Sequence, residues 1–375
     1  MSNIQTAIFP QGLALGDNFC NRELEKKRLK ANVLSARSTL IMSPRRYGKT
    51  SLVLQVLRSA KLPFAHIDLF FELNELEVQN TILKAIGDIL LTIESTPKKA
   101  FTFVTEFFSD LSVSFSVANS RVSIEFSKSR KSPAKTVLDA LKKLDTILEK
   151  RQQQVVLFFD EFQRVSQITE SETLEGALRH IAQESKNVVF IFSGSNRHLL
   201  DSMFSDRAKP LYKLCDRIIL GRITAEYYVP FIKDKFKKSL KLSISDSVID
   251  MILELTERHS YYVNLLCHRV CLEGAVPTED RVEEIWRDYV LEEKSNVSQE
   301  MDLLSANQAK MLMAIAKYGE TVKPLSGEFI TLTKFSLSSA SQAIKALEKR
   351  DYIAINDGAY TIIDPVIKYI YLFAV

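Results

Sequence analysis

Residues 41–52 read Ile-Met-Ser-Pro-Arg-Arg-Tyr-Gly-Lys-Thr-Ser-Leu, and this stretch decides the fold. An apolar run at residues 38–42 predicts a strand, and apolar residues at helical spacing begin just after Gly48-Lys49-Thr50. A strand, a tight loop and a helix N-terminus in this order form a cradle for anions. The reason is that unpaired backbone N–H groups and the positive end of the helix dipole point into the loop. The stretch therefore predicts a phosphate-binding loop.

Individual residues of this loop are expected to contact the phosphates and the metal ion of a nucleoside triphosphate. Lys49 is expected to reach the β- and γ-phosphates, and the Thr50 hydroxyl to hold Mg²⁺. Ser43 stands where the usual pattern has its first glycine, so a residue with a Cβ must make that turn. The predicted nucleotide-binding residues of the loop are Pro44, Arg45, Arg46, Tyr47, Gly48, Lys49, Thr50 and Ser51.

Length, composition and charge indicate what class of protein contains this loop. The chain has 375 residues, of which 46% are hydrophobic, so it is globular with room for two or three domains. A net charge of +4 is small for this length, and it neither requires nor excludes a nucleic-acid partner. The first 18 residues lack the charged and apolar regions of an export signal, and no segment has the apolar length of a membrane span. We expect a soluble, cytoplasmic protein.

Four cysteines are too few for a disulfide scaffold, and a chain without an export signal should meet reducing conditions. Cys267, His268 and Cys271 have a spacing that occurs in metal sites. They lie in a strongly helical stretch with no second ligand pair nearby, so cysteines packed in the core are favoured over zinc.

Strands and helices alternate on both sides of the loop. A charged helix is predicted to end near residue 34, followed after the loop by a buried strand at 63–69 and a helix at 74–93. Residues 111–126 alternate apolar and polar side chains about an Ala118-Asn119-Ser120 turn, which predicts an inserted hairpin. After a helix from residue 132, buried strands are predicted at 155–159 and 188–192, and a further strand at 217–220. This order favours a parallel sheet with crossover helices.

Two acids follow the strand at 155–159. The carboxyl ends of parallel strands form the edge where open α/β sheets bind ligands. Asp160 is expected to complete the Mg²⁺ site with Thr50, and Glu161 to polarise an attacking water. Ser193 and Asn196, at the end of the next strand, are candidates to position that water or to sense the γ-phosphate. A plain strand-terminating turn is the alternative for these two residues.

From residue 223 the pattern becomes helical. Four helices are predicted at 225–236, 245–255, 261–271 and 278–289. Three more are predicted at 308–317, 327–330 and 337–350, followed by strands at 352–355 and 359–363 about an Asn356-Asp357-Gly358 turn. Three helices and a hairpin outline a winged helix. The predicted domains are an α/β domain at 1–221 with the hairpin insertion at about 100–130, a helical lid at 222–300 and a winged helix at 301–375.

Several short motifs together resemble the archaeal-type ATPase family, which belongs among the AAA+ and STAND-like P-loop ATPases, near the initiator ATPases of replication. The matching motifs are the phosphate loop at residues 43–50, Asp160-Glu161-Phe162-Gln163, Ser193-Gly194-Ser195-Asn196, Met203-Phe204, Lys209-Pro210-Leu211-Tyr212 and His259-Ser260-Tyr261-Tyr262-Val263. The resemblance covers nearly the whole chain. It implies a P-loop NTPase fold of the AAA+-like, ASCE type, with a helical lid and a C-terminal winged helix.

The resemblance also implies ATP and Mg²⁺ as cofactors and several further site residues. Arg22 and Glu23 would lie in the segment that packs near the adenine. Arg207 is the first choice for an arginine finger or sensor and Arg217 the second, the alternative being solvated surface arginines. His259 falls at the lid sensor motif of the family, and its alternative is a helix-capping histidine. The nuclease-like C-terminal domain of some relatives has no counterpart in residues 1–375.

The predicted winged helix is nearly neutral. Residues 302–375 hold eight Lys and Arg against seven Asp and Glu, whereas a helix that reads DNA normally sits on a more basic face. A protein-interaction or regulatory role is therefore favoured over base reading. Weak DNA contact stays open through Lys323, Lys334, Lys345 and Lys349.

Two functions remain as hypotheses. The first is an ATP-binding molecular switch with ATPase activity that signals through its lid and winged helix to a protein partner, or through self-association. The second is an ATP-gated DNA-binding protein that uses the winged helix on duplex DNA.

Overall fold

The computed structural model describes residues 8–72, 74–94, 96–111, 113–118, 121–126, 133–168, 171–318, 325–356 and 359–373. Their contacts divide the chain into two compact units. The first, called here the sheet unit, consists of Arg22–Arg45 and Lys49–Leu220. The second, called here the lid unit, consists of Met1–Asn21, Arg46–Gly48 and Gly221–Val375. The tip of the phosphate loop is thus grouped with the C-terminal part of the chain.

The sheet unit is built on five parallel strands in the order β2-β5-β6-β1-β7. Every residue of β5 and β6 is buried, as expected for central strands covered on both faces. The parallel sheet with crossover helices is therefore confirmed. The strands are β1 (Thr39–Met42), β2 (Phe64–Asp68), β5 (Val155–Asp160), β6 (Val188–Gly194) and β7 (Asp216–Ile219).

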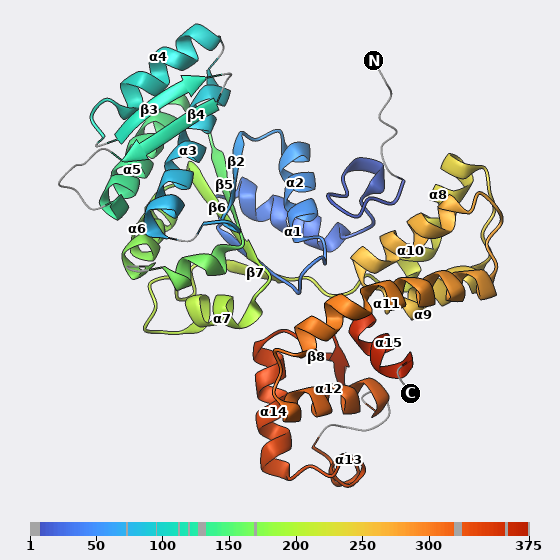
Figure 1. The fold of residues 1–375 in the computed structure, drawn as a ribbon. Helices are drawn as coiled ribbons and strands as arrows, with labels where there is room; N and C mark the ends of the chain where they lie inside the picture. The colour runs from blue at the N-terminus through green and yellow to red at the C-terminus, as the bar shows by residue number, and fades with distance from the viewer. Residues whose placement is uncertain are drawn as a thin grey trace. The chain divides into compact units, whose positions relative to one another are not determined.

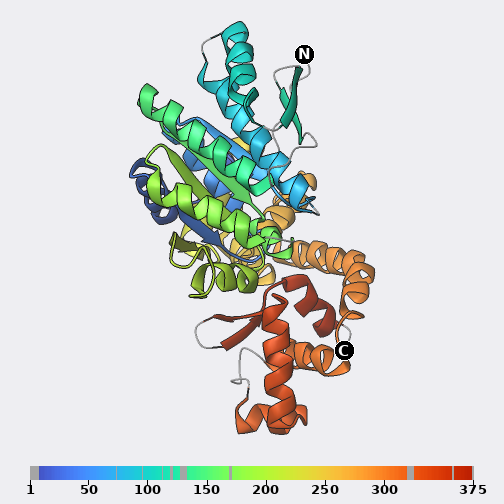
Figure 2. The ribbon, with the colours of Figure 1, turned by 90° about the vertical axis from the view of Figure 1, so that its left-hand side faces the viewer.

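Helices cover both faces of this sheet. Figure 1 shows α1 and α2 on one side and α3, α5 and α6 on the other, and Figure 2 views the sheet from the side of α3, α5 and α6. The order of strands places β1 between β6 and the edge strand β7, so that the phosphate loop leaves an inner strand of the sheet. The main helices are α1 (Glu23–Leu34), α2 (Lys49–Ala60), α3 (Glu75–Ile93), α5 (Pro133–Arg151) and α6 (Ser171–Glu184).

The predicted hairpin is present as β3 (Val113–Ala118) and β4 (Arg121–Phe126), which pair antiparallel. Its predicted turn at Asn119 and Ser120 lies outside the described residues. Three short elements of the sheet unit were not expected from the sequence. They are α4 (Pro97–Phe108), the 3-10 helix η2 (Phe162–Gln167) and α7 (Arg197–Ser205).

The lid unit contains the four helices predicted after residue 223, but one prediction of length was wrong. The predicted end at residue 289 falls inside α11, which continues to Met301. Beyond Tyr289 only Val290 and Val297 of this helix are buried, so its charged, exposed end carries little apolar periodicity. The four helices are α8 (Ala225–Lys235), α9 (Asp246–Leu255), α10 (Ser260–Leu272) and α11 (Glu279–Met301).

The winged helix follows in the same unit and shares one hydrophobic core with these four helices. Its last helix, α15, was missed by the sequence analysis. That helix begins after Asp364, whose carboxylate accepts a hydrogen bond from the backbone N–H of Val366 at 2.9 Å. The predicted turn residues Asp357 and Gly358 lie outside the described residues. The elements are α12 (Ala306–Tyr318), α13 (Gly327–Thr333), α14 (Leu337–Lys349), β8 (Ile353–Asn356), β9 (Ala359–Ile362) and α15 (Pro365–Phe373).

Candidate nucleotide site

The phosphate loop joins the last residue of β1, Met42, to the first residue of α2, Lys49. Its turn is made by left-handed backbone at Arg46, with φ 63°, and at Gly48, with φ 88°. A left-handed non-glycine residue costs on the order of 1 kcal/mol, so surrounding contacts must hold Arg46 in place. Ser43 is not left-handed, is fully buried, and donates from Oγ to the Pro44 carbonyl at 3.0 Å. A glycine is therefore not needed at position 43.

The Lys49 side chain lies over the beginning of the same loop. Its ammonium donates to the carbonyl oxygens of Ser43 at 3.2 Å and Pro44 at 3.1 Å. Lys49 is only 6% exposed, so its charge is held inside the loop by backbone dipoles. A cation cradled in this way at a helix N-terminus is suited to an oxyanion such as a phosphate.

Asp160 gathers three partners at the carboxyl edge of the sheet. Thr50 Oγ1 donates to one carboxylate oxygen at 2.5 Å, and Ser193 Oγ donates to the other. The Nε2 atom of His66 lies 3.6 Å from Asp160 Oδ2. Burial raises the pKa of Asp160, but the interactions with His66, Ser193 and Thr50 outweigh burial and lower the pKa to about 2. The carboxylate is therefore charged at neutral pH.

Glu161 is oriented by two neighbours. It has left-handed backbone, with φ 53°, at the start of η2. Its Oε2 atom accepts hydrogen bonds from Gln163 Nε2 at 2.5 Å and from Ser195 Oγ at 2.9 Å. A Cβ atom added to Gly194 would lie 1.9 Å from Gln163 Oε1, so this glycine makes room for the amide that holds Glu161.

The donor atoms fit a hard divalent cation. A threonine hydroxyl and a carboxylate, with water and phosphate oxygens, are the ligands that Mg²⁺ prefers. Within the described ranges, no group of three or more His, Cys, Asp or Glu side chains is placed to hold a metal ion. Cys267 is buried, and burial raises the pKa of its thiol well above the ordinary value, as befits a core residue.

Two other predicted residues of the sheet unit, Asn196 and Arg22, lie at helix starts. Asn196 Oδ1 accepts from the Leu199 backbone N–H at 3.0 Å and so caps α7, a role that was not considered for it from the sequence. Arg22 precedes α1, is 5% exposed and pairs with Glu25 at 3.3 Å.

The two candidate finger arginines differ in their surroundings. Arg207 is exposed in the turn after α7. Arg217 donates to Asp201 at 3.1 Å and to Ser205 at 2.7 Å. The Arg217 guanidinium is therefore bonded to two side chains of α7, whereas the Arg207 side chain is exposed to solvent.

Arg46, Tyr47 and Gly48 belong with His259 to the lid unit. The Tyr47 ring meets the His259 ring edge to face at a centroid distance of 4.7 Å, and the Arg46 guanidinium lies 4.1 Å from the centroid of Tyr261. His259 occupies the cap position of α10, but its side chain makes no capping hydrogen bond. Arg45 is exposed, and Ser51 is buried at the first turn of α2.

Sequence reasoning missed His66, Gln163, Ser195 and Arg222 as partners of the site residues. His66 and Asp68 alternate with the buried residues of β2, and this polar alternation in an otherwise apolar strand was the available signal. Arg222 donates from Nε to the Tyr47 hydroxyl at 3.2 Å. Nothing local in the sequence marks this contact, because the two residues are 175 positions apart.

Residues 39–215 match the family model of ATPases associated with various cellular activities (AAA), and residues 289–372 match that of a probable winged helix domain. No curated protein sequence matches the chain.

Among solved structures, a Walker-type ATPase of Pyrococcus abyssi has 20% identity and a TM-score of 0.70, over 97% of this chain and 99% of that chain. The ORC2 protein of Aeropyrum pernix, solved as ADPNP-ADP complexes, has 14% identity and a TM-score of 0.60, over 98% and 97%. At these identities the likeness shows the fold.

In the part of the chain that the structure describes, no helix has the length and apolar character needed to cross a membrane.

Proposed function

We propose that this chain is a nucleotide-dependent switch, because residues 39–215 match the AAA ATPase model and residues 289–372 match that of a probable winged helix domain. It binds ATP at the phosphate loop, hydrolyses it slowly to ADP and phosphate, and signals through the lid and winged helix to a protein partner. The observation that carries this proposal is the convergence of Thr50 and Ser193 on Asp160, with Glu161 beside it. This arrangement unites a metal-binding pair and a carboxylate base at one edge of the sheet.

Each residue has a proposed role in this reaction. The Lys49 ammonium and the N–H groups at the start of α2 bind the β- and γ-phosphates. Thr50 and Asp160 hold Mg²⁺, which neutralises charge between those phosphates when it is bound. Glu161, fixed by Gln163 and Ser195, orients a water for attack on the γ-phosphorus and accepts its proton.

Residues outside this core complete the proposal. Arg22 lies against the adenine, and Asn196 and His259 respond to the γ-phosphate, Asn196 through the end of β6 and His259 through Tyr47. Arg207 supplies an arginine finger to a neighbouring copy, because its guanidinium is exposed.

The test compares Lys49→Ala with Glu161→Gln. Lys49→Ala is expected to abolish ATP binding, because the phosphate charge loses its buried cation. Glu161→Gln is expected to retain binding and to lose turnover, since an amide cannot accept the proton of water. Binding is measured by calorimetry with Mg-ATP, and turnover by phosphate release. Glu184→Gln at the exposed end of α6 is the control. Hydrolysis at the wild-type rate in both site variants would refute the assignment.

The second candidate function is ATP-gated binding to duplex DNA. It is favoured by one face of α14, where Gln342, Lys345 and Lys349 are exposed at helical spacing. Binding to a labelled duplex is measured at low and physiological salt, with and without ATP. If the chain shows no ATP-dependent binding to the duplex at low salt, DNA binding is ruled out as its function, and a protein partner remains as the proposed recipient of the signal.

A further inference from the structure

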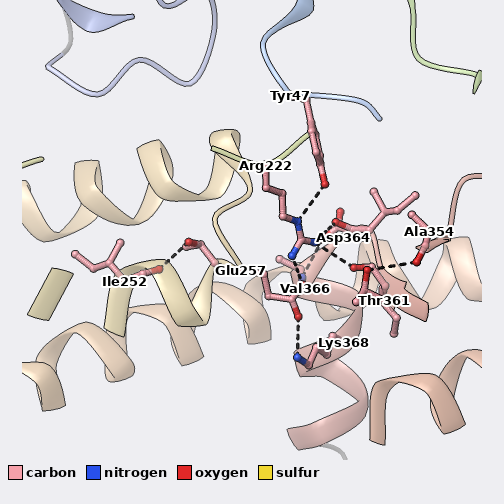
Figure 3. Close-up of polar contacts among 12 residues, drawn as sticks. Tyr47, Arg222, Ile252, Glu257, Ala354, Thr361, Asp364, Val366 and Lys368 are labelled. Carbon is pink, nitrogen blue, oxygen red and sulfur yellow. Dashed lines mark hydrogen bonds and ion pairs between the residues drawn. The ribbon is translucent and has the colours of Figure 1, made fainter. Parts of the chain in front are cut away.

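Arg222 connects the phosphate loop to the winged helix through one guanidinium group. Its Nε donates to the Tyr47 hydroxyl at 3.2 Å, and its Nη2 donates to the carbonyl oxygens of Ile362 and Ile363, each at 3.3 Å. Ile362 is the last residue of β9, and α15 begins at Pro365. Figure 3 shows Arg222 at the centre of these contacts. The guanidinium of an arginine carries its donors on three separate nitrogens in one fixed plane, a geometry that the single ammonium nitrogen of a lysine cannot reproduce.

Glu257 provides the matching negative charge. It accepts from Arg222 Nη1 at 2.6 Å and from Lys368 Nζ of α15 at 2.7 Å. The three charged side chains are between 11% and 16% exposed. Because the Glu257 carboxylate binds both cations away from water, a movement of Arg222 or of Lys368 changes the position that the other can occupy. The junction of α9 and α10 is thereby linked to the last helix of the winged helix.

The backbone around Glu257 is held in an unusual conformation. Glu257 and Arg258 are both left-handed, with φ 46° and φ 58°. Consecutive non-glycine residues in this region persist only where surrounding contacts fix them. Arg46, next to Tyr47, is left-handed as well. Both ends of the Tyr47–Arg222–Glu257 chain of contacts are therefore strained segments, each able to relax if the contacts change.

Tyr47 is two positions before Lys49 in the phosphate loop, so a phosphate held by Lys49 and the loop N–H groups acts directly on the segment that carries the Tyr47 hydroxyl. We propose that Arg222 is a positioning residue that transmits the state of the phosphate loop, through Tyr47, to Glu257, β9 and α15. This inference rests on the proposed function as a nucleotide switch and names the contacts through which the signal passes. The bound nucleotide shifts the Tyr47 hydroxyl, and Arg222 repositions the carbonyl groups and the ion pair at the winged helix.

The chain contains its own reporter for this movement. Trp286 is the single tryptophan and is fully buried. Its ring lies 5.7 Å from that of Tyr369 in α15 and 5.8 Å from that of Tyr262. Tyr262 in turn donates to Asp364 at 2.8 Å, at the start of α15. A shift of α15 therefore changes the surroundings of the Trp286 indole. The fluorescence emission of Trp286 thus reports on the position of α15 in the winged helix.

The experiment titrates Mg-ATP into the full chain and follows Trp286 emission together with the ATP dissociation constant. The substitution Arg222→Lys keeps the positive charge but removes the planar guanidinium that contacts Tyr47, Glu257 and the end of β9. We expect its ATP-dependent emission change to fall at least about fivefold, while the dissociation constant stays within about threefold of wild type. Lys368→Gln is expected to act in the same direction, because it frees α15 from Glu257 without touching Tyr47. Arg281→Lys, which alters exposed ion pairs of α11 with Glu273 and Glu284, is the matched control and is expected to respond as wild type.

The outcomes separate this inference from the proposed function. A full emission change in Arg222→Lys and Lys368→Gln would overturn the relay and leave the nucleotide switch standing. A wild-type chain that binds ATP without any change in emission, or in amide hydrogen exchange of residues 359–373, would overturn the relay and leave ATP binding standing. A wild-type chain that does not bind ATP would overturn both.

Discussion

The Thr50 hydroxyl donates a 2.5 Å hydrogen bond to the Asp160 carboxylate, joining residues 110 positions apart in the sequence. Thr50 follows β1 and Asp160 ends β5, and β6 lies between these two strands in the sheet. All three strands run parallel, so their carboxyl ends meet at one edge. Ser193 of β6 reaches Asp160 from the strand between them. The pair that we propose to hold Mg²⁺ is thus assembled by strand order.

Replacing Thr50 by Val tests this pair. Valine keeps the shape of threonine and removes the hydroxyl, so we expect ATP turnover to fall roughly 10- to 100-fold. Thr50→Ser keeps the hydroxyl and is expected to stay within about threefold of wild type. Steady-state phosphate release over a range of Mg²⁺ concentrations measures both. Equal activity in the Val and Ser variants would contradict the role of the hydroxyl.

Gly194→Ala is expected to disturb Glu161 without altering any charged group. The added Cβ would meet Gln163 Oε1 at 1.9 Å and Leu200 Cδ1 at 3.0 Å, so the Gln163 amide must move away from Glu161. We expect a loss of about 1–3 kcal/mol in the free energy of unfolding and a 10- to 100-fold lower turnover. Urea unfolding and phosphate release measure the two effects.

Gly176→Ala is the matched control for that substitution. Gly176 lies in α6, and a Cβ added there meets nothing within 4 Å. Alanine in a helix is favoured over glycine, so this variant is expected to gain about 0.5–1 kcal/mol in stability. Full turnover in Gly194→Ala would show that Gln163 does not position Glu161.

Glu175 predicts how stability depends on pH. This residue of α6 is 1% exposed, and its Oε2 atom has no hydrogen-bond partner among the described residues. Burial raises the pKa of Glu175 to about 7, against an ordinary value of 4.5, with the charge of Lys209 opposing and that of Glu172 adding to the rise. The folded chain therefore holds a proton that the unfolded chain has lost, and stability falls as the pH rises from about 4.5 to about 7.

Glu175→Gln removes this dependence. At pH 8 the variant is expected to be more stable than wild type by up to about 3 kcal/mol, and at pH 4.5 to differ little. Urea unfolding at both pH values measures the difference. Glu184→Gln at the exposed end of the same helix should stay within about 0.5 kcal/mol of wild type at both. A larger gain at pH 4.5 than at pH 8 would contradict the assignment.

Arg207 can be tested as a finger supplied to a neighbouring copy. Arg207→Ala is expected to reduce turnover on the order of 10³-fold while keeping ATP binding. Mixing it with Lys49→Ala should restore activity, because each variant supplies the group that the other lacks. Arg217→Ala is the comparison, and its expected effect is on stability, through the lost contacts with Asp201 and Ser205. Specific activity independent of protein concentration, with no recovery in the mixture, would rule out the finger.

The sequence determined the parts of this protein that depend on neighbouring residues. Gly48-Lys49-Thr50 between a strand and a helix predicted the phosphate loop, and five apolar residues before Asp160 predicted a central strand. Such signals are local, since a strand buried on both faces must be apolar and a helix start exposes N–H groups whatever lies around it. The winged helix was predicted for the same reason, except for α15, a helix of nine mostly apolar residues.

Only the tertiary structure decided which distant groups meet. Strand register pairs His66 of β2 with Phe158, two residues before Asp160, and the His66 ring reaches the Asp160 carboxylate. The close approach of Gly194 to Gln163 fixes Glu161. Arg222 meets Tyr47, Glu257 and the end of β9 because the lid unit packs them around one guanidinium. Side chains such as these carry no periodicity of their own. Their partners are chosen by packing and by the need to pair buried charges, and both are properties of the folded chain.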